Sequence, residues 1–229
     1  MHEQIFSLSG VNLSLKGNAG LVKILKDISL TIERGETVSL TGASGSGKSS
    51  LLMLLGGLEQ ASSGAVIAMG NDLAKMSEDA LSRFRRSHMG IVFQAFHLIP
   101  TMTALENVAT PLELAGQRDA FARAEVELFN VGLEHRIYNY PAQLSGGEQQ
   151  RVALARAVVL KPNIILADEP TGNLDSQNGT AIINVLFQLR EKYGSTLVLV
   201  THDVALANRC DRVISLSDGF IISEKKGYH

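Results

Sequence analysis

The sequence predicts an α/β fold with a mainly parallel sheet, an antiparallel β part near the N-terminus and an inserted helical subdomain. Three observations support this fold class. The first forty residues alternate apolar and polar side chains, as half-buried strands do. The last third alternates short apolar strands with helical segments, which favours parallel pairing. Between these parts, from about residue 95 to 160, the pattern is helical throughout.

The N-terminal part contains short alternating segments separated by turn residues, and each segment is expected to be a strand. The elements expected there are strands over 11–15, 28–32 and 64–70, a loop over 17–20, and turns over 33–36 and 70–72. We expect a single domain over 1–229. Residues 1–36 and 64–72 would form its antiparallel β part, residues 95–160 its helical subdomain, and the rest its core.

The core begins with a short strand over 37–41 that feeds a glycine-rich loop and an apolar helix over 48–58. Asp119 is expected to cap a helix over 120–131, and Gly132 to end it. The remaining core elements are strands over 90–93, 164–167, 196–200, 213–216 and 220–222, helices over 178–192 and 204–210, and a hairpin turn at 218–219.

Composition narrows the classes of function. Of the 229 residues, 45% are hydrophobic, which is enough for a sizeable core. The net charge of −2 gives no basic excess, so a dedicated nucleic-acid binder is not expected. The one cysteine, Cys210, indicates a reduced thiol in a cytosolic protein. No stretch reaches the ~18–20 apolar residues of a membrane span, so a second chain would have to supply any membrane part.

A glycine-rich loop with the G-x-x-x-x-G-K-S pattern joins the strand over 37–41 to the following helix. Its glycines let backbone N–H groups wrap phosphates at a helix N-terminus. Lys48 would add a charge near the β and γ phosphates, and the Ser49 hydroxyl would bind Mg²⁺. A chance glycine-rich turn is the alternative, and the strand-to-helix position argues against it. The expected nucleotide-binding residues are Gly42, Ala43, Ser44, Gly45, Ser46, Gly47, Lys48, Ser49 and Ser50.

Two further patterns follow downstream. Asp168 ends an apolar strand, from which a carboxylate can reach Mg²⁺ through water, and Glu169 lies either on the opposite side of the strand or in the next turn. Adjacent acids could also be an ordinary solvated turn. Ser145 is a good helix N-cap, and Gly146-Gly147 allow an anion close to the backbone. A capped helix alone would not explain two glycines in its first turn.

The order of these motifs, with Leu144-Ser145-Gly146-Gly147-Glu148-Gln149-Gln150 between the phosphate loop and the acidic strand, resembles the ATP-binding cassette (ABC) ATPases. The resemblance implies a head-to-tail pair of chains that sandwich two ATP molecules. It also implies a role for each matching residue: Lys48, Glu169 and His202 in catalysis, Ser49, Gln94 and Asp168 at Mg²⁺, Ser145, Gly146, Gly147 and Glu148 against the γ-phosphate on the opposite subunit, and Asp175 at the dimer interface.

The segments 93–100, 103–108 and 167–175 look like the LolD/MacB/YbbA group of ABC ATPases, nearest to its YbbA branch. The resemblance implies ATP and Mg²⁺ as cofactors and two partners, a second copy of the chain and an integral membrane permease with an extracytoplasmic domain. It places the chain at the cytoplasmic face of a bacterial inner membrane, driving export or extraction of lipoproteins, peptides or hydrophobic compounds. No nucleic-acid partner is expected.

One departure and two alternatives accompany this resemblance. The family stacks adenine on an aromatic residue, but that place is held by about Leu15, and 7–83 contains no Tyr, Phe or Trp. Apolar contact in place of stacking would lose ~1 kcal/mol.

A soluble ABC ATPase acting on DNA or ribosomes is the main alternative, although no coiled-coil insert or zinc module is present. A P-loop kinase or GTPase is the other, against which the 144–150 motif argues.

A basic cluster lies in the helical pattern that begins at Ser77, before the strand expected over 90–93. It is expected to be a solvated helix face, with a contact to a partner or to lipid headgroups as the alternative reading. Its members are Arg83, Arg85, Arg86 and His88.

Overall fold

The computed structural model describes residues 3–17 and 20–227, which fall into two compact units. One unit comprises residues 1–85 and 196–229, and the other comprises residues 86–195. Asn18 and Ala19, in the loop expected over 17–20, lie outside the described residues.

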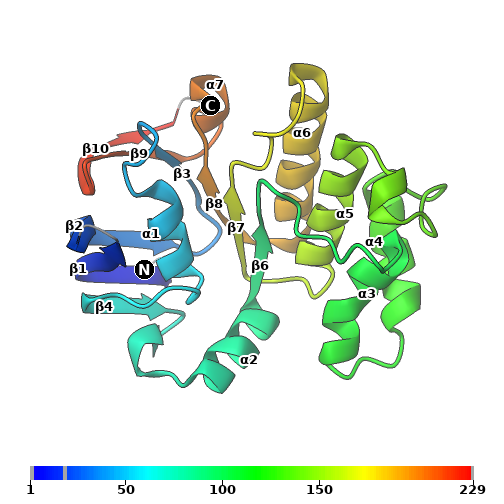
Figure 1. Ribbon diagram of the computed structural model, residues 1–229, viewed down its shortest axis with the longest axis horizontal. Coiled ribbons are helices and arrows are strands. Elements are labelled where there is room, and N and C mark those ends of the chain that lie inside the picture. Colours follow the sequence, from blue (N-terminus) through cyan, green and yellow to red (C-terminus); the bar gives the residue numbers. More distant parts are fainter. Residues whose placement is uncertain (1–2, 18–19, 228–229) are drawn as a thin grey trace. The chain divides into compact units, whose positions relative to one another are not determined.

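The antiparallel β part of the first unit is confirmed (Figure 1). Strands β1 (Gln4–Gly17) and β2 (Gly20–Glu33) pair along their whole length, and β4 (Ser63–Ala68) and β5 (Asn71–Asp72) extend the sheet in the order β2-β1-β4-β5. Both long strands exceed the expected segments because register shifts near Leu8, Val11 and Leu13 interrupt the alternation without ending the pairing. The turn lies at Met69-Gly70, both with positive φ, so the turn expected over 70–72 was wrong by one residue.

A second sheet in this unit is mainly parallel, as expected. Strand β3 (Thr37–Thr41) lies between β8 (Thr196–Val200) and β9 (Arg212–Ser217), parallel to both. All five residues of β8 are buried, which is typical of a strand covered on both faces. Strand β10 (Phe220–Lys226) returns antiparallel to β9 through the expected hairpin turn at 218–219.

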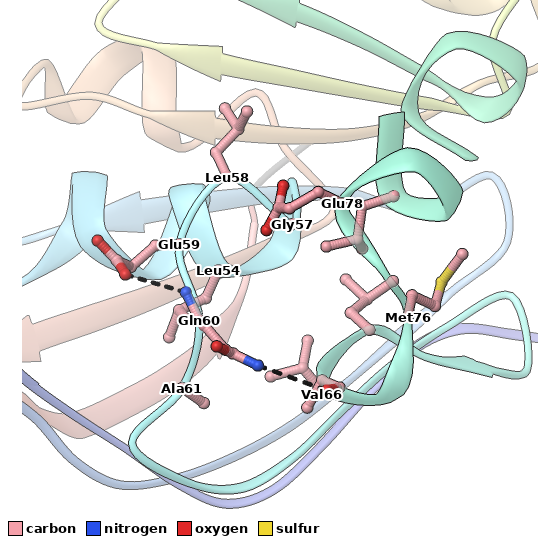
Figure 2. A pocket seen from close by; sticks show the side chains of 12 residues that line it. Leu54, Gly57, Leu58, Glu59, Gln60, Ala61, Val66, Met76 and Glu78 are labelled. Carbon is pink, nitrogen blue, oxygen red and sulfur yellow. Dashed lines mark hydrogen bonds between the residues drawn. The ribbon is translucent and has the colours of Figure 1, made fainter. Parts of the chain in front are cut away.

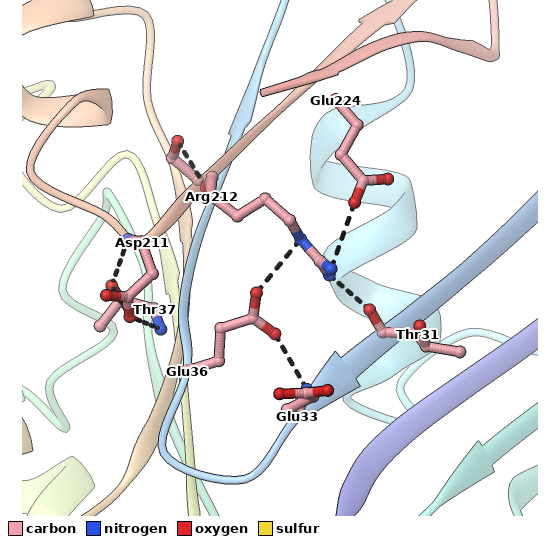
Figure 3. Close-up of polar contacts among 8 residues, drawn as sticks. Thr31, Glu33, Glu36, Thr37, Asp211, Arg212 and Glu224 are labelled. Carbon is pink, nitrogen blue, oxygen red and sulfur yellow. Dashed lines mark hydrogen bonds and ion pairs between the residues drawn. The ribbon is translucent and has the colours of Figure 1, made fainter. Parts of the chain in front are cut away.

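Arg212, the first residue of β9, links neighbouring strands at one edge of this unit (Figure 3). Its guanidinium forms ion pairs with Glu36 and Glu224, each at 3.2 Å, and donates to the Thr31 carbonyl. Beside it, the carboxylate of Asp211 accepts hydrogen bonds from the backbone N–H and the hydroxyl of Thr37, both at 2.7 Å. The network joins β2, β3, β9 and β10 at the edge opposite to the glycine-rich loop.

Two helices of this unit are shorter than expected. Helix α1 (Lys48–Leu55) ends before Leu58 because Gly57 takes a positive φ of 59° and the Leu58 N–H turns back to the Met53 carbonyl. Helix α7 (Val204–Ala207) ends before Cys210 because the N–H groups of Arg209 and Cys210 bond three residues back, as in a tightened last turn.

The second unit contains the expected helical region and a parallel pair of strands, β6 (Met89–Val92) and β7 (Ile164–Asp168). Helices α3, α4 and α5 pack against one another, and α6 packs against α5 (Figure 1). The bounds of the helices are α2 (Glu78–His88), which joins the two units, α3 (Ala104–Leu114), α4 (Ala120–Asn130), α5 (Gly146–Val158) and α6 (Ser176–Tyr193). The limits of a helical subdomain at 95 and 160 stay a prediction.

Helix starts in this unit are set by local side chains. Thr103 and Glu106 form a reciprocal capping box on α3. Asp119 occupies the N-cap position of α4 as expected, but its side chain makes no capping hydrogen bond. The predicted N-cap position is therefore confirmed, but a φ of −100° and a ψ of 25° are not the extended backbone from which a side chain usually caps a helix.

Candidate functional site

The glycine-rich loop leaves β3 with a backbone that requires glycine. Gly42, Gly45 and Gly47 have φ values of 142°, 79° and 101°. A Cβ atom on Gly42 would lie 2.2 Å from the Leu216 carbonyl oxygen, whereas one on Gly45 would meet nothing within 4 Å. At position 42, glycine is therefore required both by the backbone conformation and by the lack of room for a Cβ atom. At position 45, it is required by the backbone conformation alone.

Lys48 gives this loop its charge and its shape. The side chain is only 7% exposed, and its Nζ donates to the carbonyls of Gly42 at 3.0 Å and Ala43 at 2.9 Å. The loop is thus wound around an ammonium group at the first turn of α1. Ser46 Oγ is buried and has no hydrogen-bond partner in the described part of the chain. A buried hydroxyl without a partner, in the same loop as a buried cation, suits an anionic ligand that supplies oxygen atoms.

His202 lies at the same edge of the parallel sheet as this loop. Because β3 and β8 run parallel, their carboxyl ends meet, and the Thr201 N–H bonds the Leu40 carbonyl at 3.2 Å. The His202 side chain is exposed just beyond this contact. Asp203 then fixes the chain by accepting from the backbone N–H groups of Ala205 and Leu206 at the start of α7.

In the second unit, Asp168 is the half-buried last residue of β7, after four buried residues. Glu169 follows with a φ of 42°, in the left-handed region. Its carboxylate therefore belongs to the turn after the strand, which decides between the two placements that the sequence left open. The turn is closed by a hydrogen bond from the Gly172 N–H to the Glu169 carbonyl.

Gln94, which follows β6, is linked to the segment after Glu169. Its Nε2 donates to Asn173 Oδ1 at 3.3 Å, and Asn173 Nδ2 donates to the Gln94 carbonyl at 2.9 Å. The Gln94 side chain lies over Gly172, where a Cβ atom would come within 2.6 Å of Nε2. The structure thus brings the Gln94 amide and the loop after β7 together.

Ser145 and Glu148 form a capping box at the start of α5. Ser145 Oγ accepts from the Glu148 N–H, and Glu148 Oε2 accepts from the N–H and hydroxyl of Ser145, both at 2.8 Å. These bonds hold the pKa of Glu148 below its ordinary value, and the Arg136 guanidinium 3.1 Å away acts in the same direction.

The two glycines that follow have a packing reason as well as a chemical one. A Cβ on Gly146 would lie 3.2 Å from Leu174 Cδ2, and one on Gly147 would lie 3.3 Å from Asn178 Oδ1. Asp175 caps α6 through Asn178, accepting from its N–H at 3.0 Å and its Nδ2 at 2.6 Å. The start of α5 therefore rests directly on the segment that carries Asp175.

Two residues that the sequence did not single out hold the segment after Gln94. Asn107, fully buried, accepts from the Ile99 N–H and donates to three carbonyls between 99 and 103. Arg156 donates to the carbonyls of Phe96 at 2.8 Å and His97 at 2.7 Å, both of which have positive φ. Burial lowers the pKa of Arg156 from its ordinary value. A charge that interrupts the apolar face of α5 was the only sequence signal.

Two further expectations, on Leu15 and on the basic cluster, have different outcomes. Leu15 is 40% exposed and lies opposite Val22 in the β1–β2 hairpin, so an apolar and non-aromatic surface stands there. The basic cluster is solvated only in part: Arg83 and Arg86 are exposed, and Arg85 and His88 are half-buried. Arg85 donates to the Gly57 carbonyl, Arg86 donates to the Leu114 carbonyl, and the His88 ring bonds Asn163.

One cavity of the first unit lies apart from these residues. It measures about 290 Å³ and opens between α1, β4 and α2 (Figure 2). Leu54, at the far end of α1 from the glycine-rich loop, is part of its wall, and no predicted site residue is. Within the described residues, no helix is long and apolar enough to cross a membrane.

Comparison with known proteins matches this set of motifs. The family model described as "ABC transporter" matches residues 25–172. The chain is 51% identical to the ABC transporter ATP-binding protein YbbA of Escherichia coli (strain K12) over 205 residues, 89% of this chain and 90% of that protein. It is 46% identical to the macrolide export ATP-binding/permease protein MacB 1 of Aeromonas hydrophila over 228 residues, 99% of this chain and 35% of that protein.

A solved structure agrees with these matches. The ATP-binding cassette MJ0796, in a dimeric post-hydrolysis state bound to ADP and Pi, superposes with a TM-score of 0.90 at 40% identity, covering 98% of this chain and 99% of that chain. The chain therefore belongs to the ABC transporter family, as an ATP-hydrolysing cassette of the LolD/MacB/YbbA group.

Proposed function

We propose that two copies of this chain bind two ATP molecules head to tail and drive a separate membrane permease of the MacB/LolD type. The observation that carries the proposal is the start of α5. There, the exposed Ser145 caps a helix whose first two residues are glycines, so that the positive end of a helix dipole lies beside backbone with no side chain. A helix start of this kind is suited to the γ-phosphate of a nucleotide held by another copy.

In the first unit, the backbone of residues 42–50 would wrap the phosphates, with Lys48 releasing the carbonyls of Gly42 and Ala43 to meet the β and γ oxygens. His202, at the same sheet edge, would stabilise charge on the γ-phosphate. The buried Ser46 hydroxyl supports the proposal, because a phosphate oxygen would supply its missing partner.

In the second unit, Glu169 would orient the attacking water from its position in the turn after β7. Gly146 and Gly147 would supply anion contacts to the opposite subunit, and Asp175 would organise the interface beside them. Since α5 rests on Leu174 and Asn178, closing two copies would move these groups together.

Mg²⁺ fits the donor set that the sequence indicates. The Ser49 hydroxyl, the Gln94 amide and the Asp168 carboxylate offer hard oxygen atoms with a single negative charge. Mg²⁺ in nucleotide sites takes one or two carboxylates, substrate phosphates and water. When bound, it would neutralise charge on the phosphates, while the residues of this chain fix where those phosphates lie.

The permease partner is supported by MacB 1, whose printed name joins ATP-binding and permease functions in one protein and of which this chain matches 35%. We infer that the permease with its extracytoplasmic domain is a separate polypeptide, and that the chain works at the cytoplasmic face of the inner membrane. Cargo would be selected by that permease, among lipoproteins, peptides or hydrophobic compounds.

The test is affinity purification of tagged Glu169→Gln protein with ATP from detergent-solubilised membranes. The variant should bind ATP without turning it over and hold its partners. Recovery of a multispan protein in fixed ratio supports the proposal. Recovery of ribosomes or DNA-repair proteins, or of no partner from membranes that contain the permease gene product, refutes it.

A further inference from the structure

We propose that Asn173 is a positioning residue that fixes the Gln94 side-chain amide with its oxygen, and not its nitrogen, available to the metal ion. This inference rests on the proposed function, which assigns the Gln94 amide to Mg²⁺. Asn173 itself would touch neither the metal nor the nucleotide.

The orientation follows from which atoms can donate. The Gln94 backbone carbonyl can only accept, so the Asn173 atom 2.9 Å away must be the NH₂ group. This leaves Asn173 Oδ1 on the other side of the same amide, and that oxygen can only accept. Its neighbour at 3.3 Å on Gln94 must therefore be Nε2. One backbone carbonyl thus determines the direction of both amides, and Gln94 Oε1 is left out of the pair.

The direction matters because a cation distinguishes the two ends of an amide. Mg²⁺ binds the oxygen and is repelled by the NH₂ group, which carries partial positive charge. The Gln94 side chain is exposed, so without Asn173 its terminal amide can rotate freely between both directions. Residues that orient a ligand from behind typically change metal affinity 10–100-fold. Since this pair is exposed, we expect the lower end, about tenfold.

Gly172 provides an independent constraint on the same amide. A Cβ atom there would lie 2.6 Å from Gln94 Nε2, 2.9 Å from Cδ and 3.2 Å from Cγ. All three are atoms of a flexible side chain, so Gly172→Ala would move the Gln94 amide without a clash against backbone. The backbone of Gly172 does not have a positive φ, so alanine is not excluded by conformation.

The experiment measures ATP affinity with Mg²⁺ and with EDTA by calorimetry, in Glu169→Gln protein so that no turnover occurs. The ratio of the two dissociation constants reports the metal's contribution. The variants are Gln94→Ala, Asn173→Ala, Gly172→Ala and the double variant Gln94→Ala/Asn173→Ala. Asn130→Ala is the matched control, because it removes the same side chain from α4, where it bonds Glu127. Thermal unfolding checks that each variant is folded.

Asn173→Ala and Gly172→Ala should each reduce the ratio about tenfold with little change in EDTA, and Asn130→Ala should not. In the Gln94→Ala background, Asn173→Ala should have no further effect, since its only route is through that amide. A persistent effect there, or an unchanged ratio in Asn173→Ala, overturns the inference while the role of Gln94 stands. An unchanged ratio in Gln94→Ala refutes the metal assignment itself, and with it the role of Asn173. If Asn173→Ala fails to fold, Asn173→Ser takes its place, because it also removes both amide hydrogen bonds to Gln94.

Discussion

Replacing Arg156 by methionine should release the segment after Gln94 from its present conformation. Arg156 extends from α5 and donates to the carbonyls of Phe96 and His97, which have φ values of 58° and 49°. Methionine keeps much of the apolar stem and removes both donors. The backbone at these two residues is thus held against its own preference by one guanidinium.

The magnitudes decide the outcome. Two hydrogen bonds from a charged group contribute about 1.5–3 kcal/mol each. A left-handed backbone costs about 1–2 kcal/mol at each of two non-glycine residues. With Arg156 present, its two hydrogen bonds stabilise the segment by more than the left-handed backbone at Phe96 and His97 costs. Without Arg156, no side-chain hydrogen bond compensates that cost. Relaxation then recovers part of the loss, so we expect a net decrease in the free energy of unfolding of about 1.5–2 kcal/mol, together with a changed loop.

The assay combines urea unfolding with amide hydrogen exchange over residues 94–100. Arg156→Met should lower the urea midpoint and speed exchange in this segment. Arg156→Lys, which can reach one carbonyl, should lie between the two proteins. A stability change below about 0.5 kcal/mol with unchanged exchange would show that the left-handed turn does not depend on this residue.

Three other perturbations have calculable results. Gly42→Ala should lower the free energy of unfolding by about 3 kcal/mol and abolish ATP binding, because its Cβ would meet the Leu216 carbonyl. Gly45→Ala should lower it by only about 1 kcal/mol. Equal effects of the two variants in urea unfolding would contradict this. Ser145→Ala should cost about 1 kcal/mol at pH 7. Because the pKa of Glu148 in the folded protein is lowered, the stability that its bonds to Ser145 contribute is present above the ordinary pKa of 4.5 and is lost as pH falls through the folded pKa. If the stability difference between Ser145→Ala and wild type does not shrink in acid, Ser145 and Glu148 are not coupled in this way. Burial raises the pKa of the Cys210 thiol to about 12, so native protein should not react with a thiol reagent at pH 8, and rapid reaction would show that this site opens.

The fold and most of the site elements could be predicted because their signals are local. The strand over 37–41, the glycine-rich loop and the helix after it form one contiguous pattern whose geometry is dictated by backbone chemistry. The N-cap at Ser145 is likewise a local signal, and the structure contains it.

What the sequence did not reveal depends on contacts between distant residues. Arg156 and Asn173 act through hydrogen bonds to backbone carbonyls 60 and 79 positions away, and no spacing rule predicts such bonds. For Asp119, in contrast, the local signal predicted the N-cap position but not the absence of a capping hydrogen bond. Its residue type favours capping, but the local backbone does not place it for that role.

The central claim is that each ATP site is completed by the Ser145 end of another copy. Its most direct test is sedimentation of Glu169→Gln protein with and without Mg-ATP, beside the same protein carrying Ser145→Arg. An ATP sandwich predicts that Glu169→Gln changes from one chain to two on adding Mg-ATP, and that Glu169→Gln/Ser145→Arg binds ATP but stays a single chain. A Glu169→Gln protein that binds ATP as a monomer, or a double variant that dimerises equally well, would contradict completion of the site by a second copy.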